Sequence, residues 1–223
     1  MSGLLFLRTF AGVPEATKEQ YEKRTPKDGV VLVAVNWGRL WGVNGAENAE
    51  LRGISFDLAG RHKLVTEKAD LEMEGPSGVL ARIAVKPVFL NYAIILPEGR
   101  YLMSGFDVKV ARSAQEIYHI KADRSQMVVE NDSKLGYFDV KAGETVYIGN
   151  FFLDKAMEPY LWRYYSPLPE AFQTHLAEFR SKYPFLPIEN VKYRLFETST
   201  IGNKYPEPPE PNHSPEPTPG AVH

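Results

Sequence analysis

The sequence has no cysteine among its 223 residues. Thiol catalysis, disulfide bridges, Cys-ligated zinc and Cys-ligated iron–sulfur clusters are therefore excluded. A chain of this length can bury enough apolar surface to fold without such cross-links. The lack of cysteine leaves the cellular compartment open, because a core of this size can be stable in the cytosol or in the periplasm.

The sequence also has little net charge and no long apolar run. Its 26 Lys and Arg residues are nearly balanced by 28 Asp and Glu residues, which gives a formal charge of −2. Nucleic-acid-binding proteins carry a basic footprint, so we expect no nucleic-acid partner. No window approaches the ~20 apolar residues of a membrane span, so we expect no transmembrane segment. The apolar start at Gly3 to Leu7 is shorter than the roughly 7 to 15 residues of a signal-peptide core, so we expect no export signal in the chain as it stands.

The short motifs of common enzyme classes are missing as well. The sequence contains no G-x-G-x-x-G, G-x-x-x-x-G-K-[ST], H-E-x-x-H or G-x-S-x-G pattern, which argues against nucleotide-binding, zinc-protease and serine-hydrolase functions. The histidines are scattered without the close spacing that seeds a metal site. They are His62, His119, His175, His213 and His223. We therefore expect no catalytic residue, no metal, no cofactor and no enzymatic activity.

Acidic residues between positions 67 and 74 alternate, or nearly alternate, with apolar ones, which predicts the solvated face of a strand. They are Glu67, Asp70, Glu72 and Glu74. Two carboxylates held several ångströms apart can also hydrolyse a glycosidic bond. An acid/base hydrolase therefore stays open as a third hypothesis.

Proline and glutamate crowd the C-terminus. Beyond Tyr205 the chain has seven prolines and three glutamates but no Lys or Arg. Such a composition cannot build a strand ladder or a core, so we predict a disordered, polyproline-biased tail over residues 206–223. The pairs Pro206 with Pro209 and Pro208 with Pro211 match P-x-x-P, so a ligand for an SH3-like groove is the alternative.

Short apolar or alternating runs, punctuated by Gly, Pro, Asn and Asp, dominate the rest of the chain. They predict an antiparallel β-sandwich in a single domain over residues 1–205. The expected strands are Leu4 to Phe10, Val30 to Asn36, Leu51 to Leu58, Val79 to Val85, Asn91 to Leu96, Arg100 to Val110, Glu116 to Lys121, Gln126 to Glu130, Gly136 to Val140, Thr145 to Phe152 and Val191 to Glu197. The turns at Leu96 to Gly99 and Lys141 to Glu144 have the composition of hairpin connections, so we expect the strands flanking each turn to pair.

Two segments predict helices. Pro14 to Lys23 is rich in Glu and Lys and predicts a polar surface helix. Pro169 to Tyr183 predicts an amphipathic helix that lies on a sheet, because its large apolar residues recur on one face. They are Phe172, Leu176, Phe179 and Tyr183.

Two aromatic segments are candidate binding surfaces. One places two tryptophans among glycines that permit a bend, and the other runs from position 160 to position 165. Exposed rigid rings can stack on sugars or anchor a protein partner, and burial in the core is the competing role for both segments. The candidate binding residues are Trp37, Trp41, Tyr160, Trp162, Tyr164 and Tyr165.

Two motifs carry a resemblance to a known group of proteins. The first is Leu96-Pro97-x-Gly99-x-Tyr101-Leu102, and the second is Phe138-x-Val140-x-Ala142-Gly143-Glu144-x-Val146-Tyr147-Ile148-Gly149-Asn150-Phe151. With the later Tyr183-Pro184 pair, they resemble uncharacterised bacterial envelope proteins and lipoprotein-like β-sandwich domains, over about Val88 to Pro184.

The resemblance implies a location in the periplasm or cell envelope and no established catalytic residue. Its members are often anchored by a lipidated cysteine behind a signal peptide; this sequence contains no cysteine, and we expect no signal peptide in it. Peripheral membrane association would follow if a lipid anchor had been trimmed, and a cytoplasmic location would follow if the N-terminus is native.

We therefore expect a non-enzymatic, cell-envelope-associated structural or protein-interaction protein whose partner is another protein. The alternative is a small-ligand or carbohydrate-binding module that uses the exposed aromatic residues.

Overall fold

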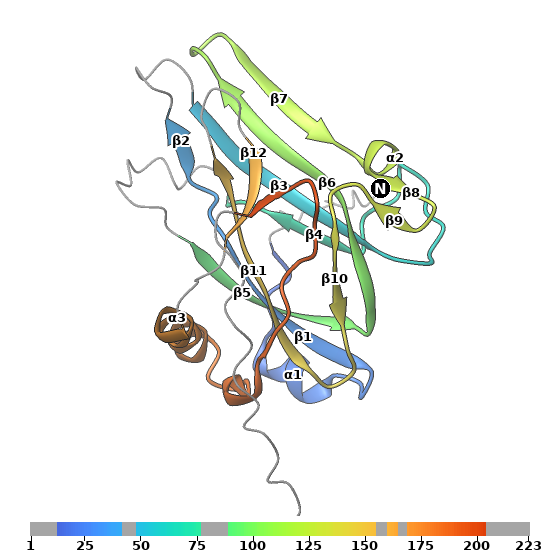
Figure 1. Ribbon diagram of the computed structural model, residues 1–223, viewed down its shortest axis with the longest axis vertical. Helices are drawn as coiled ribbons and strands as arrows, with labels where there is room; N and C mark the ends of the chain where they lie inside the picture. The colour runs from blue at the N-terminus through green and yellow to red at the C-terminus, as the bar shows by residue number, and fades with distance from the viewer. Residues whose placement is uncertain (1–12, 42–47, 77–88, 155–159, 165–168, 204–223) are drawn as a thin grey trace, which may run out of the picture.

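The computed structural model describes residues 13–41, 48–76, 89–154, 160–164 and 169–203 (Figure 1). Strands account for 47% and helices for 16% of the structure, in several sheets, so the prediction of a mainly β protein is confirmed. The strands expected at 4–10 and 79–85 and the tail expected at 206–223 lie outside the described residues.

The first sheet has the strand order β14-β12-β11-β1-β5, and β13 also pairs with β11. Its strands are β1 (Asp28–Val35), β5 (Leu90–Pro97), β11 (Thr145–Asp154), β12 (Tyr160–Tyr164), β13 (Lys192–Tyr193) and β14 (Gly202–Asn203). β1 is antiparallel to β5 but parallel to β11, so the prediction of wholly antiparallel pairing is wrong at the centre of this sheet. Every residue from Val30 to Val35 is buried, and such a continuous apolar run is typical of a strand covered on both faces.

The second sheet has the order β10-β6-β3-β2, with β4 pairing with β3 and β7 pairing with β6. Its strands are β2 (Arg39–Trp41), β3 (Asn48–Leu58), β4 (Leu71–Glu74), β6 (Gly99–Ala111), β7 (Ile117–Ala122) and β10 (Tyr137–Val140). A separate ribbon pairs β8 (Val128–Val129) with β9 (Asp132–Ser133). β3 and β6 form a long ladder that pairs Asn48 with Ala111 at one end and Leu58 with Tyr101 at the other. The loop that follows β3 therefore begins at the second of these ends.

The two sheets share one apolar cluster, and β1 shows how the alternation of side chains divides the core. Val31, Val33 and Val35 face the cluster shared with the second sheet. Val30 and Leu32 point to the opposite face of the first sheet.

The helix α3 (Pro169–Lys182) covers that opposite face (Figure 1). Leu176 and Phe179 are buried there, together with Tyr183 just beyond the last turn. A short 3-10 helix, η1 (Ile188–Asn190), follows and closes the edge of the same cluster.

Two short elements differ from the expectation. The helix α1 (Lys18–Lys23) begins four residues later than predicted, because Thr17 and Gln20 form a reciprocal capping box at its start. The strand predicted over Val191 to Glu197 is reduced to β13 and one isolated bridge between Glu197 and Tyr137.

Both predicted hairpins are wrong, although the turn at 141–144 forms and is closed by a hydrogen bond from the Glu144 N–H to the Lys141 carbonyl oxygen. At residues 96–99 the chain makes a bend at Glu98, which leads from β5 of the first sheet to β6 of the second. The turn at 141–144 leads from β10 of the second sheet to β11 of the first. Turn residues reverse the chain direction, but they do not decide whether the flanking strands share hydrogen bonds or pack face to face. Here the flanking strands bury residues such as Leu96 and Tyr101 in the cluster between the sheets, which places them in opposite sheets.

Replacing Gly143 by valine should destabilise the protein more than replacing the exposed Lys141 by alanine. Gly143 has φ +71°, where a β-branched residue is strained by about 1–3 kcal/mol. The exposed lysine should cost less than about 0.5 kcal/mol. Urea denaturation measures both variants, and equal midpoints would contradict the left-handed turn.

Candidate functional site

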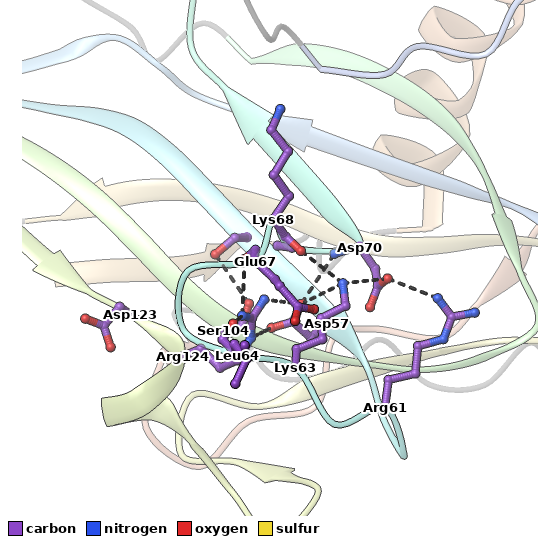
Figure 2. Close-up of polar contacts among 12 residues, drawn as sticks. Asp57, Arg61, Lys63, Leu64, Glu67, Lys68, Asp70, Ser104, Asp123 and Arg124 are labelled. Carbon is purple, nitrogen blue, oxygen red and sulfur yellow. Dashed lines mark hydrogen bonds and ion pairs between the residues drawn. The ribbon is translucent and has the colours of Figure 1, made fainter.

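Asp57, near the end of β3, is the one acidic residue that is buried among the described residues, with 6% of its surface exposed. Two hydrogen bonds join its carboxylate to the guanidinium of Arg124 (Figure 2). Arg124 Nε lies 2.6 Å from Oδ2, and Nη2 lies 2.8 Å from Oδ1. This two-point geometry fixes the orientation of the guanidinium as well as its position.

The helix α2 (Arg124–Met127) presents this arginine. The Asp123 side chain accepts the N–H of Ser125, and the Gln126 side chain accepts the N–H of Asp123, so a capping box starts a single helical turn. The strand predicted over residues 126–130 is therefore wrong, and β8 is its only remaining part in the described structure.

A second ion pair extends the cluster. Lys63 Nζ lies 2.7 Å from Asp70 Oδ1 and 3.6 Å from Asp57 Oδ1. Asp70 also accepts the backbone N–H of Leu58 at 2.8 Å, while Arg61 approaches it from the solvent side at 3.2 Å. Asp70 was expected on a solvated face, but its side chain is largely buried among these partners.

The same cations hold the backbone of the loop at residues 59–70. Arg124 Nη1 donates to the carbonyl oxygens of Leu64 and Glu67, the latter at 3.2 Å. Lys63 Nζ donates to the carbonyl oxygen of Lys68 at 3.0 Å. Through these hydrogen bonds, the largely buried side chains of Arg124 and Lys63 hold the loop at the end of the second sheet (Figure 2).

The turn between β8 and β9 lies beside this loop (Figure 1). Glu130 and Asn131 both have positive φ, 49° and 66°, as the tight turn of a two-residue hairpin requires. The Asn131 side chain accepts the N–H of Gly60 at 3.3 Å, which ties the turn to the loop.

Electrostatics favour the charged form of this cluster. Burial alone would raise the pKa of Asp57, but hydrogen bonds from Arg124 and Ser104 and the charges of Arg124 and Lys63 hold it below its usual range. The hydrogen bond to Asp57 in turn raises the pKa of Arg124. A carboxylate whose acceptor positions are filled by protein donors is suited to holding structure together, and not to exchanging protons with a substrate.

Large apolar side chains project from the loop and the turn that this cluster holds. Leu64 is 67% exposed, Val65 is 57% exposed, and Val129 on β8 is 50% exposed. Among the described residues, the fourth large apolar side chain with comparable exposure is Ile117, on β7. Three of the four therefore belong to the loop at 59–70 and the β8–β9 ribbon.

A pocket of about 410 Å³ lies beside β9. It is lined by Asp132, Ser133, Gly136, Tyr137 and residues 197–199. The Tyr137 hydroxyl donates to the Glu197 carboxylate, which raises the pKa of the tyrosine. The lining is thus rich in hydroxyls and carries two carboxylates.

The aromatic residues singled out from the sequence do not gather in this site. Trp37 is 2% exposed, and its indole N–H donates to the Tyr92 hydroxyl at 2.8 Å, so its ring is part of the core and offers no binding platform. The side chains of four other candidates lie outside the described part of the structure. They are Trp41, Tyr160, Trp162 and Tyr164. The fifth, Tyr165, lies wholly outside the described residues.

Sequence analysis missed Asp57 and Arg124. One sequence feature could have indicated Asp57, because it lies between Phe56 and Leu58 in a predicted strand, and a carboxylate there must find a cation if its face of the strand is buried. No comparable feature marks Arg124, since its role depends on the fold bringing residues 57 and 124 together.

A largely buried histidine, His175, lies on the inner face of α3, apart from this site. The ring of His175 contacts those of Tyr147 and Phe179 edge to face, with centroids 5.4 and 5.1 Å apart. Its Nδ1 lies 3.5 Å from Glu178, whose carboxylate also accepts from the Asn91 side chain. Burial lowers the pKa of His175, and Glu178 offsets this only in part.

The chain matches no protein-family model, no curated protein and no solved structure. Among the described residues, no three or more His, Asp or Glu side chains gather to hold a metal ion. No described helix has both the length and the apolar character needed to cross a bilayer.

Replacing Asp57 by asparagine should destabilise the protein by about 3 kcal/mol, because it leaves the buried guanidinium of Arg124 without a counter-charge. The matched control is Asp139→Asn, which breaks a similar two-point pair with Arg100 on a more exposed surface and should cost less than about 1 kcal/mol. Chemical denaturation at neutral pH compares the two, and similar losses would show that the Asp57 pair has no special role.

Acidification should destabilise the protein through His175. Its pKa is lower in the folded state, so its contribution is fully present above the unfolded pKa of about 6.5 and is lost as pH falls through the folded value. His175→Phe should flatten the fall in melting temperature between about pH 7 and pH 5, whereas His62→Gln, at an exposed position, should not. Identical pH profiles for wild type and His175→Phe would contradict the burial of a neutral imidazole.

Proposed function

We propose that this chain is a non-enzymatic protein-interaction module. Its binding surface consists of the loop at residues 59–70 together with the β8–β9 ribbon, and we call this the loop surface. The observation that carries the proposal is the contrast between a backbone held by buried ion pairs and the apolar side chains of Leu64 and Val65 that it exposes.

This contrast has a physical meaning. An unconstrained loop could fold its leucine and valine inward, since burial of each such side chain is worth about 1.5–3 kcal/mol. Arg124 and Lys63 instead hold the loop backbone through its carbonyl oxygens. Holding apolar groups outward in advance reduces the ordering cost of association, and loops on a rigid β framework are common binding elements.

Two finer features belong to this proposal. The two sheets on one apolar cluster support a β-sandwich with α3 as its helical cover. The composition of residues 206–223 supports a Pro-rich tail. The resemblance of the motifs at residues 96–102 and 138–151 to envelope proteins supports a place in the cell envelope, where the partner would be another protein.

Site-specific photo-cross-linking tests the loop surface. A benzophenone amino acid at position 65 or 129 should give discrete protein adducts in cells that make this protein, because both side chains are exposed on the loop surface. The same probe at Ile117 is the matched control, since that residue is similarly exposed but lies on β7.

The adducts formed at position 129 should fall at least about fivefold when Leu64 and Val65 are both replaced by serine. Equal cross-linking from position 117, or adducts unaffected by the double serine variant, would contradict the proposal.

A further inference from the structure

The hydroxyl-rich pocket adjoins the loop surface. Val129 on β8 pairs directly with Asp132 on β9, and Asp132 lines the pocket. An exposed apolar side chain thus lies next to the pocket rim. A partner that contacts Val129 would have the pocket within reach of a neighbouring side chain.

The pocket walls are held rigidly. Gly136 has φ +120°, and a Cβ at this position would lie 2.1 Å from the carbonyl oxygen of Glu197, so glycine permits the close approach of the segment at 197–199. The Ser133 hydroxyl donates to the carbonyl oxygen of Met103 and accepts the N–H of Leu135. Both walls are therefore in place before anything binds.

The charge of the pocket is unbalanced. Asp132 and Glu197 form no ion pair within the described part of the chain, although their carboxylates accept hydrogen bonds from the Ser133 N–H and the Tyr137 hydroxyl. The neighbouring guanidinium of Arg100 stacks on Tyr137 and is engaged by two hydrogen bonds to Asp139. The pocket therefore presents two carboxylates, while the hydroxyls of Ser133, Tyr137 and Thr198 are engaged by hydrogen bonds within the chain.

We propose that this pocket receives a basic side chain, lysine or arginine, of the protein partner that binds the loop surface. A cationic group matches the two carboxylates, while an anion would be repelled by them. A volume of about 410 Å³ accommodates one such side chain. The inference rests on the proposed function, because it takes the cation to be delivered by the partner that contacts Val129.

A titration of the isotope-labelled full chain followed by NMR tests the pocket without the partner. The probes are Nα-acetyl-arginine amide and Nα-acetyl-lysine amide, with the neutral Nα-acetyl-citrulline amide as the isosteric control. We expect saturable shifts confined to residues 132–137 and 197–199 with at least one cationic probe, and no saturable shift with citrulline. The loss of one charge-assisted hydrogen bond in Glu197→Gln or Asp132→Asn should weaken binding about tenfold.

Glu22→Gln removes an exposed carboxylate on α1, far from the pocket, and should leave the binding of the cationic probe unchanged. Asp132 is exposed, so its variant remains informative if the Glu197 variant fails to fold. Equal shifts with citrulline, saturation by methyl glucopyranoside instead, shifts that arise from concentration alone, or no saturable shift would each overturn the proposal. If the cationic probes do not bind but the cross-links still form, the proposal of a basic side chain is overturned, whereas the proposal that the loop surface binds a protein is retained.

Discussion

The ion pair between Asp57 and Arg124 joins parts of the chain that no local rule would bring together. Asp57 belongs to β3, a long strand at the centre of the second sheet, and Arg124 opens a one-turn helix beyond β7. A buried carboxylate is tolerated only when its charge and its oxygen lone pairs are satisfied. Arg124, Ser104, Lys63 and the backbone of Asp70 all contribute to satisfying it, and in doing so they fix the end of the sheet.

The shape of the loop surface follows from this pair. Because Arg124 uses its remaining nitrogen on loop carbonyls, the charges that satisfy Asp57 also determine the path of residues 59–70. Asn131 then joins the β8–β9 turn to the loop through Gly60. The exposed apolar side chains of the loop surface are thus positioned by this polar cluster.

The sequence predicted the elements well and their connections poorly. Strands such as β1, β6 and β11 were found because apolar runs and alternation are local properties of the chain. The change of chain direction near Glu98 and the turn at 141–144 were also predicted, but the strands that flank them lie in opposite sheets, since pairing depends on which faces meet across the core. The candidate site escaped prediction for a similar reason: the partner of Asp57 lies 67 residues away in the chain. The burial of Trp37 could not be predicted from composition, because a tryptophan ring suits both a buried core and an exposed binding surface.

Buried charge, not apolar packing, holds the loop at residues 59–70 in a single conformation. Backbone 15N relaxation of residues 62–68 tests it most directly, in the wild-type protein and in a folded Arg124→Met variant that keeps the apolar stem but removes the guanidinium. We expect wild-type order parameters near the ~0.85 of rigid backbone and values below about 0.6 in the variant, with the β3–β6 ladder unchanged. A loop that is already flexible in the wild type, or equally ordered in both proteins, would contradict it.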